Sequence, residues 1–81
     1  MITEMDLRVD SRYTSVMLEN ERSKLRMTQQ DVANAIGVSV QSVCNWENGK
    51  MPSLWNLMAL SCLYEVPINR LVLYRNSGGV Q

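Results

Sequence analysis

The 81-residue sequence predicts one small all-α domain of five short helices, preceded by a short N-terminal arm. Apolar residues make up 46% of the chain, which is enough for one core. From Tyr13 onward, apolar positions recur at helical spacing, and Ser, Thr, Pro and Gly stand where helices begin and end. These patterns divide the chain into an arm at 1–12, a helical domain at 13–75 and a flexible tail at 76–81.

The arm shows a different pattern from the rest of the chain. Met5, Leu7 and Val9 alternate with charged residues, and this period of two is typical of a strand. Because a single strand needs a partner, the arm either pairs with its two-fold mate in a dimer or stays disordered. Residues 1–21 carry a net charge of −3 and residues 22–81 carry +3, so the neutral total hides an acidic arm and a mildly basic domain.

The first helix is expected at about 13–25. Thr28 is an N-cap with Asp31 three places on, so a second helix starts there. Gly37 ends this helix because it adopts a positive φ without strain. The apolar positions of the two helices are Val16, Met17, Leu18, Leu25, Val32, Ala33 and Ile36.

Three further helices follow. Ser39 caps a third helix that runs to about Glu47, where Asn48 and Gly49 close it. Pro52 and Ser53 open a fourth helix that stops near Val66, and Pro67 favours a fifth. The residues expected to face inward from the last two helices are Leu54, Leu57, Met58, Leu60, Ile68, Leu71 and Val72. Cys62 is also expected in the core, and Met17, Met27 and Met58 are expected to fill it.

The turn between Gly37 and Ser39 is as short as the connection of a helix-turn-helix motif, whose second helix can enter the DNA major groove. A helical wheel places Val43, Trp46 and Glu47 on the core side of the third helix. The opposite side is polar and uncharged, with Gln41, Cys44, Asn45 and Asn48, bordered by Val40 and Ser42. Amides match the edge of adenine, and Val can pack on a thymine methyl group. The alternative is an ordinary solvent-exposed helix.

Between residues 18 and 71, many residues stand at the spacing of a known family of domains, with almost no gaps. They are Leu18, Arg22, Leu25, Met27, Thr28, Gln29, Val32, Ala33, Ile36, Gly37, Val38, Ser39, Val43, Trp46, Glu47, Asn48, Gly49, Lys50, Pro52, Ser53, Leu54, Leu57, Leu60, Val66 and Leu71. This set resembles the phage repressor and Cro type of helix-turn-helix domain, often called XRE-like. The resemblance implies a compact, five-helix, repressor-like fold that binds DNA.

The resemblance also implies roles for individual residues. The positions that read base edges are Val40, Gln41, Ser42 and Asn45. The positions that contact DNA phosphates are Thr28, Gln29, Ser39, Asn48 and Lys50. Arg22 and Glu47 match an ion pair that bridges the first and third helices.

Three residues depart from the family pattern. Glu21 replaces an apolar residue, Glu65 replaces a common Gly at the end of the fourth helix, and Trp55 replaces a polar residue. Trp55 is expected to point outward and to contact a second subunit or the DNA backbone, since exposed Trp is a frequent interface anchor. The dimer interface is expected at Trp55, Leu71, Leu73 and Tyr74, the last three on the C-terminal helix, with a contribution from the arm.

These features predict a sequence-specific transcriptional regulator of the repressor type, which binds a palindromic double-stranded DNA operator as a homodimer. Zero net charge keeps open an alternative, a protein-interaction module of the antitoxin or anti-repressor type. An enzyme is disfavoured because the chain has no His, no Gly-rich phosphate loop and no metal-ligand cluster, so we expect no catalytic residue, metal or cofactor. Charged residues through the first 25 positions, and no apolar run of about 18 residues, predict a cytoplasmic protein without a membrane span.

Overall fold

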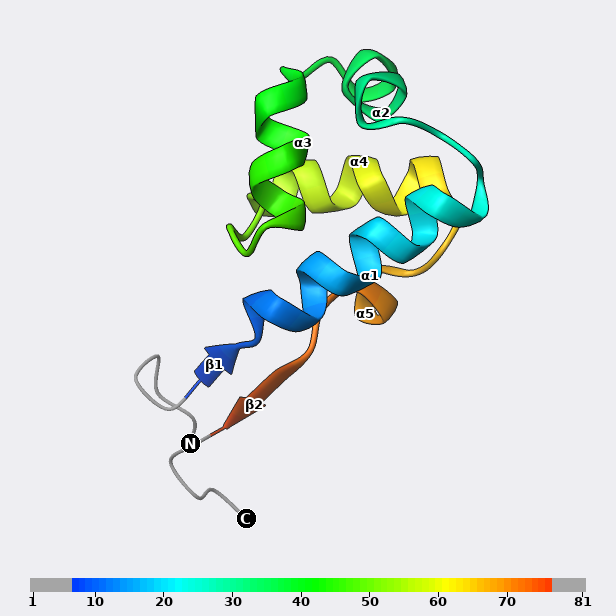
Figure 1. Ribbon diagram of the computed structural model, residues 1–81. Helices are drawn as coiled ribbons and strands as arrows, with labels where there is room; N and C mark the ends of the chain where they lie inside the picture. Colours follow the sequence, from blue (N-terminus) through cyan, green and yellow to red (C-terminus); the bar gives the residue numbers. More distant parts are fainter. Residues whose placement is uncertain (1–6, 77–81) are drawn as a thin grey trace.

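The computed structural model describes residues 7–76, which form five helices and two short strands (Figure 1). In chain order the elements are β1 (Leu7–Val9), α1 (Ser11–Lys24), α2 (Gln29–Ile36), α3 (Val40–Glu47), α4 (Leu54–Tyr64), α5 (Ile68–Leu71) and β2 (Tyr74–Asn76). The predicted five-helix fold is confirmed, and the pair of strands is added to it.

A side-chain oxygen caps the N-terminus of each of the first four helices. The caps are Asp10, Thr28, Ser39 and Ser53, which accept hydrogen bonds from the backbone N–H three residues on at 3.0, 3.0, 3.1 and 3.2 Å. Three of these caps are as predicted. Asp10 was not predicted, and because it caps α1, this helix begins at Ser11 rather than at 13. The segment assigned to the arm therefore contains the start of α1.

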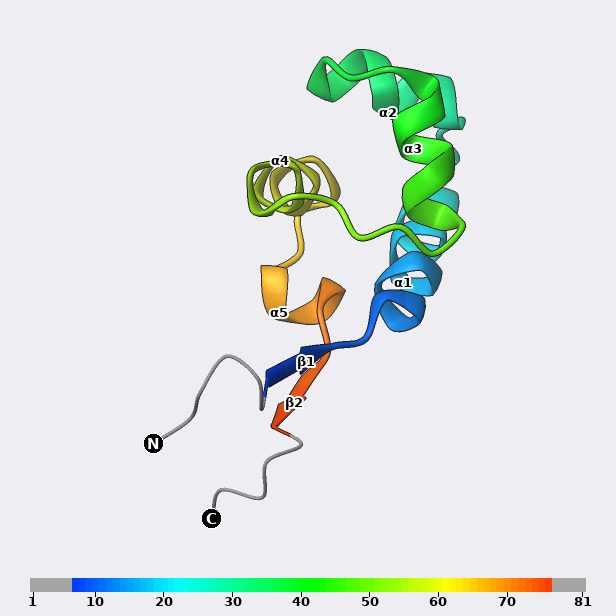
Figure 2. The same ribbon diagram turned by 90° about the vertical axis from the view of Figure 1, so that its left-hand side faces the viewer.

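The helices pack around one core, with α1, α2 and α3 on one side and α4 and α5 on the other (Figure 2). The buried cluster comprises Leu18, Val32, Ala33, Val43, Trp46, Leu60, Tyr64 and Leu71. Met17 and Met27 pack against this cluster, as predicted.

Three residues of α4 that were predicted to face inward are exposed. Leu54 is 67% exposed, Met58 is 45% exposed, and Cys62 is also exposed. The prediction was wrong because α4 carries apolar side chains around its whole circumference. Only the side with Leu57 and Leu60 meets the core.

The arm and the C-terminal segment form a two-stranded antiparallel ribbon. Leu7 pairs with Asn76, Arg8 with Arg75 and Val9 with Tyr74. The arm was expected either to pair with its two-fold mate in a dimer or to stay disordered. For residues 7–9 neither is right, because the partner strand comes from the same chain. The predicted C-terminal helix is also shorter than expected, so Leu73 and Tyr74 follow α5 and do not lie on it. Met5 and the tail residues 77–81 lie outside the described range, whereas Asn76 belongs to β2.

The two glutamates that depart from the family pattern occupy different environments. Glu21 is buried, and its carboxylate lies 3.2 Å from the ammonium of Lys24. Glu65 is the C-cap of α4 and has φ 57°, the left-handed conformation that glycine adopts most easily.

Candidate nucleic-acid interface

The candidate site is built on the turn that joins α2 to α3. Gly37 has φ 76°, and the N–H groups of Gly37 and Val38 both donate to the carbonyl of Ala33, at 2.9 and 3.0 Å. This left-handed residue ends α2 and turns the chain sharply, so that α3 crosses α2 at a steep angle in both views (Figures 1 and 2). The connection is the predicted helix-turn-helix motif.

The two sides of α3 differ as the helical wheel predicts. Val43 and Trp46 are buried in the core, while Val40 and Gln41 lie on the exposed side. The Gln41 Nε2 donates to Asn45 Oδ1 at 2.8 Å, one helical turn apart. This bond holds the two amides side by side and leaves Gln41 Oε1 and the Asn45 amino group for a ligand.

The first turn of α3 is fixed by two serines. Ser39 caps the helix, and its hydroxyl lies 3.1 Å from the hydroxyl of Ser42. A hydroxyl has one donor and two acceptor positions, so each serine keeps capacity for a further hydrogen bond. The structure therefore brings the four predicted base-reading residues together on α3, with Val40 and Gln41 exposed and Ser42 and Asn45 half-buried.

Arg22 and Glu47 form the predicted ion pair between α1 and α3. The Arg22 Nε and Nη2 atoms lie 2.8 and 3.0 Å from the two carboxylate oxygens, and the Glu47 side chain is 4% exposed. Arg22 Nη1 also donates to the carbonyl of Met27 at 2.9 Å. The hydrogen bond to Glu47 raises the pKa of Arg22 against the opposing effect of burial.

Gln29 links the same carboxylate to α2, since its Nε2 donates to Glu47 Oε1 at 3.0 Å. One carboxylate thus receives hydrogen bonds from α1 and α2 while it stands on α3. This network sets the position of α3 against the other two helices. Gln29 supports the third helix in this way, and its expected phosphate contact stays a prediction.

The N-terminus of α2 has a complete capping box. The Thr28 N–H donates to Asp31 Oδ2 at 2.8 Å, and the Asp31 N–H donates to Thr28 Oγ1 at 3.0 Å. The hydrogen bond from the Thr28 backbone lowers the pKa of the Asp31 carboxyl group. The Thr28 hydroxyl contributes to the same effect, so the capping box engages both the backbone and the side chain of Thr28.

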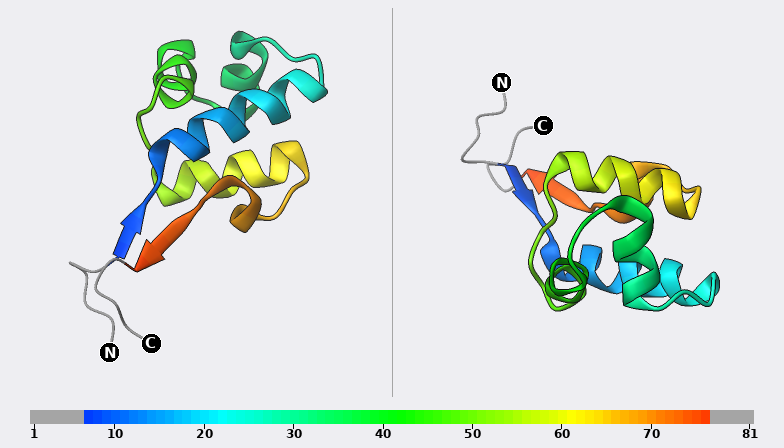
Figure 3. Two further views of the ribbon diagram at one scale, coloured as in Figure 1. Left: turned by 60° about the horizontal axis from the view of Figure 1, so that its bottom comes forward. Right: turned by 90° about the horizontal axis from the view of Figure 1, so that it is seen from above.

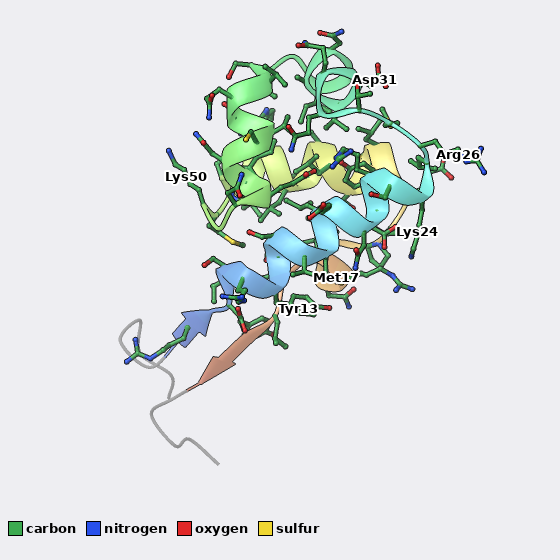
Figure 4. The ribbon with its side chains drawn as sticks, viewed as in Figure 1. Tyr13, Met17, Lys24, Arg26, Asp31 and Lys50 are labelled. Atoms are coloured by element: carbon green, nitrogen blue, oxygen red, sulfur yellow. The ribbon has the colours of Figure 1, made fainter. Side chains whose placement is uncertain are left out.

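The turn after α3 differs in detail from the expectation. Asn48 Nδ2 donates to the carbonyl of Cys44 at 2.8 Å and lies 3.4 Å from the Cys44 sulfur. The amide hydrogens of Asn48 therefore serve the end of α3. Lys50 is exposed and points away from the body beside α3 (Figure 4).

A groove of about 440 Å³ lies between the start of α1 and the end of α3. It is lined by Ser11, Arg12, Ser15, Val16, Glu47, Asn48 and Gly49. Arg12 is exposed and adds a cation next to the turn that carries Lys50. The sequence pattern places Arg12 in the arm and does not predict this position, because only the packing of α1 against α3 brings Arg12 near Asn48.

The other cations of the helical domain are placed differently. Lys24 and Arg26 lie at the far end of α1 from Lys50 (Figure 4). Arg22 is neutralised by Glu47. These three cations therefore add no free positive charge beside α3.

The four residues predicted for a dimer interface fall into three environments. Leu71 is 0% exposed and belongs to the core of its own chain, so its prediction as a contact to a second subunit was wrong. Trp55 is 78% exposed on α4, while Leu73, just before the ribbon, and Tyr74, in its strand β2, are also exposed.

Two kinds of feature are absent from residues 7–76. No group of three or more His, Cys, Asp or Glu side chains there could hold a metal ion. None of the helices in this range has both the length and the apolar character needed to cross a membrane.

Comparison with solved structures shows a shared fold. The chain is similar to Apo-HppE (TM-score 0.73), to FeII HppE (0.73) and to hydroxypropylphosphonic acid epoxidase from S. wedmorenis in complex with fosfomycin (0.72). Each is 23% identical over 79% of this chain, and the aligned part covers 36%, 35% and 35% of those chains. The chain therefore spans about a third of their length, and the likeness concerns the fold alone.

Sequence comparison gives the family. No curated protein matches the chain. The family model described as helix-turn-helix (HTH_3) matches residues 18–71, about two thirds of the sequence, and this range contains the whole α2–turn–α3 motif. The chain belongs to this helix-turn-helix family of DNA-binding domains.

Proposed function

We propose that this protein is a transcriptional repressor that binds a palindromic operator as a homodimer, with α3 in the major groove. The observation that carries the proposal is the exposed Gln41–Asn45 pair on α3. Surface helices usually carry Glu, Lys and Arg, whereas this side carries amides and hydroxyls without charge. Such groups match the donors and acceptors on base edges.

Residues at the start of α2 and at both ends of α3 support the same orientation. Thr28 and Gln29 lie at the start of α2, Ser39 lies at the start of α3, and Lys50 follows the end of α3. Hydroxyl, amide and ammonium donors in these places suit the phosphates on either side of a groove. We add Arg12 to this set, because it lines the groove beside Asn48. Asn48 contributes by fixing the turn, since its amide hydrogens are directed to Cys44.

The need for a homodimer follows from the size of the recognition surface. One short helix reads only a few base pairs, and each good base contact supplies about 1–3 kcal/mol of discrimination. Two copies on half-sites about one helical turn apart double this contribution. The protein would act in the cytoplasm of a bacterial or phage-infected cell.

A protein-interaction module is the second candidate, and the charge distribution favours it. With Lys24 and Arg26 at the far end of α1, few cations lie near α3, so non-specific attraction to DNA is weak. The same polar side of α3 would then contact a partner protein.

A selection from random-sequence duplexes with the purified protein separates the two candidates. The repressor proposal expects an enriched palindrome, and a variant with Gln41→Ala and Asn45→Ala should lose the enrichment while its circular dichroism spectrum is unchanged. If low salt yields no enriched sequence, the repressor proposal fails and the interaction module is favoured.

A further inference from the structure

The helix α4 has a composition that its own chain does not account for. Its eleven residues, Leu54–Tyr64, include no charged side chain. Leu57, Leu60 and Tyr64 are buried on the core side. A helix that is apolar all round is normally covered all round, yet no described residue covers the side of α4 that faces away from the core.

The uncovered side is a continuous stripe. Trp55, Met58 and Cys62 follow one another at intervals of three and four residues, which places them on one face of a helix. Together with Ala59 they line an apolar groove of about 220 Å³. We name this set of four residues the outer α4 face.

We propose that the outer α4 face is the surface on which a second copy of this chain docks, so that two α4 helices meet across a two-fold axis. This inference rests on the proposed function, because a palindromic operator calls for two copies. It selects α4 over Leu73 and Tyr74, the other exposed residues expected at the dimer interface.

Charge supports a second copy as the occupant. In a two-fold contact every residue near the axis meets its own equivalent, so a charged residue there would meet a like charge. The outer α4 face is neutral, and two copies meet without repulsion. A partner with acidic or basic residues would find no opposite charge on α4.

The arrangement of the helices supports the same occupant. In Figure 2, α3 is turned toward the viewer, and α4 is seen end-on at the side of the molecule away from α1. A two-fold axis along the line of sight, just beyond α4, leaves both α3 helices facing the viewer. This is the arrangement that two half-sites on one side of a duplex require.

The size of the surface sets the strength of the contact. Burial of a Trp side chain removes roughly 150–250 Å² from water, and the symmetry counts Trp55 twice. A patch built around one Trp falls short of the roughly 800 Å² per partner of a standard interface, so the free dimer should be weak. Binding to both half-sites would then strengthen the association.

Sedimentation equilibrium over a wide concentration range measures the association. The wild type should form dimers, and Trp55→Gln should weaken the association by about thirtyfold or more, as expected for an interface Trp. Met58→Gln should weaken it to a smaller extent. Tyr74→Gln and Leu25→Gln are matched controls, because they remove exposed apolar side chains elsewhere and should leave the association unchanged.

Tryptophan fluorescence places the contact independently. The chain has two tryptophans, of which Trp46 is buried in the core and Trp55 is exposed. In the wild type and in Met58→Gln, the emission should shift to the blue in step with the fraction of dimer, since only Trp55 changes its environment.

A wild type that stays monomeric, or a dimer that forms without the emission shift or tolerates Trp55→Gln, overturns the inference. If Tyr74→Gln weakens the association and Trp55→Gln does not, the interface lies on the ribbon and the inference is also overturned. Binding to a half-site duplex distinguishes a failure of this inference from a failure of the proposed function. All four variants should bind it like the wild type, whereas a wild type that dimerises through Trp55 but binds no duplex contradicts the proposed function alone.

Discussion

The guanidinium of Arg22 on α1 binds both carboxylate oxygens of Glu47 on α3, at 2.8 and 3.0 Å. Gln29 donates to the same carboxylate from α2, so three helices meet at one buried acidic side chain. This side chain is the last residue of α3, directly before the turn that carries Lys50. The pair therefore controls both stability and the position of the proposed recognition helix.

Removal of the Glu47 carboxylate should be costly. Glu47→Ala strands the Arg22 charge in a largely buried place, and we expect a loss of about 3–5 kcal/mol in the free energy of unfolding. Urea denaturation of the two single variants and the double variant Arg22→Ala/Glu47→Ala measures the coupling. Gln30→Ala removes only an exposed hydrogen bond to Asn34 and should stay within about 0.5 kcal/mol of the wild type. Additive losses in the double variant would show that the pair contributes no interaction energy.

The amide pair of α3 should behave as one unit toward DNA. Gln41→Ala and Asn45→Ala should each weaken operator binding by about 1–3 kcal/mol and relax the base preference. Because each amide holds the other in place, the double variant should lose less than the sum of the two single losses. Titration of operator and scrambled duplexes tests this. Full additivity would mean that the 2.8 Å bond does not persist in the complex.

The salt dependence should identify the cations that face DNA. Lys50→Gln should reduce the slope of log K against log salt by about one unit and affect all sequences alike. Arg12→Gln should do the same, since Arg12 lines the groove beside the turn. Arg26→Asn is the control, because Arg26 lies at the opposite end of α1 and has φ 57°, which Asn tolerates. An unchanged slope for Lys50→Gln would remove this residue from the interface.

Acid should remove the contribution of the Asp31 carboxylate to the α2 capping box. The pKa of Asp31 is lowered in the folded protein by the hydrogen bond from Thr28, so the ionised carboxylate stabilises the fold. The stabilisation is complete above the ordinary pKa of 3.8 and is lost as the pH falls through the lowered folded value. Asp31→Asn should therefore be less stable than the wild type at pH 7, and the two melting temperatures should converge in acid. A difference that persists at low pH would point to a cause other than ionisation.

Replacement of Glu65 by glycine should stabilise the fold. An L-residue in the left-handed region is strained by roughly 1 kcal/mol, and glycine avoids this strain. Glu65→Gly should raise the free energy of unfolding by about that amount, as measured by thermal denaturation. Glu65→Ala keeps the Cβ atom and should give no gain, so an equal gain from Ala would point to the charge instead of the backbone.

Local signals in the sequence predicted the elements that depend on neighbouring residues. Thr28, Ser39 and Ser53 cap helices as expected, and Gly37 has the positive φ that ends α2. The periodicity of α3 separated buried Val43 and Trp46 from the exposed side. The Arg22–Glu47 pair was predicted by the family resemblance, which supplied a contact between residues far apart in the chain.

The predictions that were wrong or missing concern features that depend on packing between distant segments. Tyr74 pairs with Val9 across most of the chain, and no local pattern marks a three-residue strand after a helix. The exposed Met58 and Cys62 were assigned to the core because every side of α4 is apolar, so periodicity could not choose between sides. Arg12 was missed for the related reason that its neighbours come from α3.

The ribbon of β1 and β2 has a mechanical consequence. Its two antiparallel strands extend outward from the helices, with the Leu7–Asn76 pair at the outer end (Figures 1 and 3). Tension applied through the two ends of the chain acts along the hydrogen bonds between the strands and loads them one pair at a time. Such a ribbon unzips at low force from Leu7 inward, up to the bond between the Asp10 N–H and the Leu73 carbonyl. Once that bond has opened, the pull acts on the start of α1 and on the segment that follows Leu71.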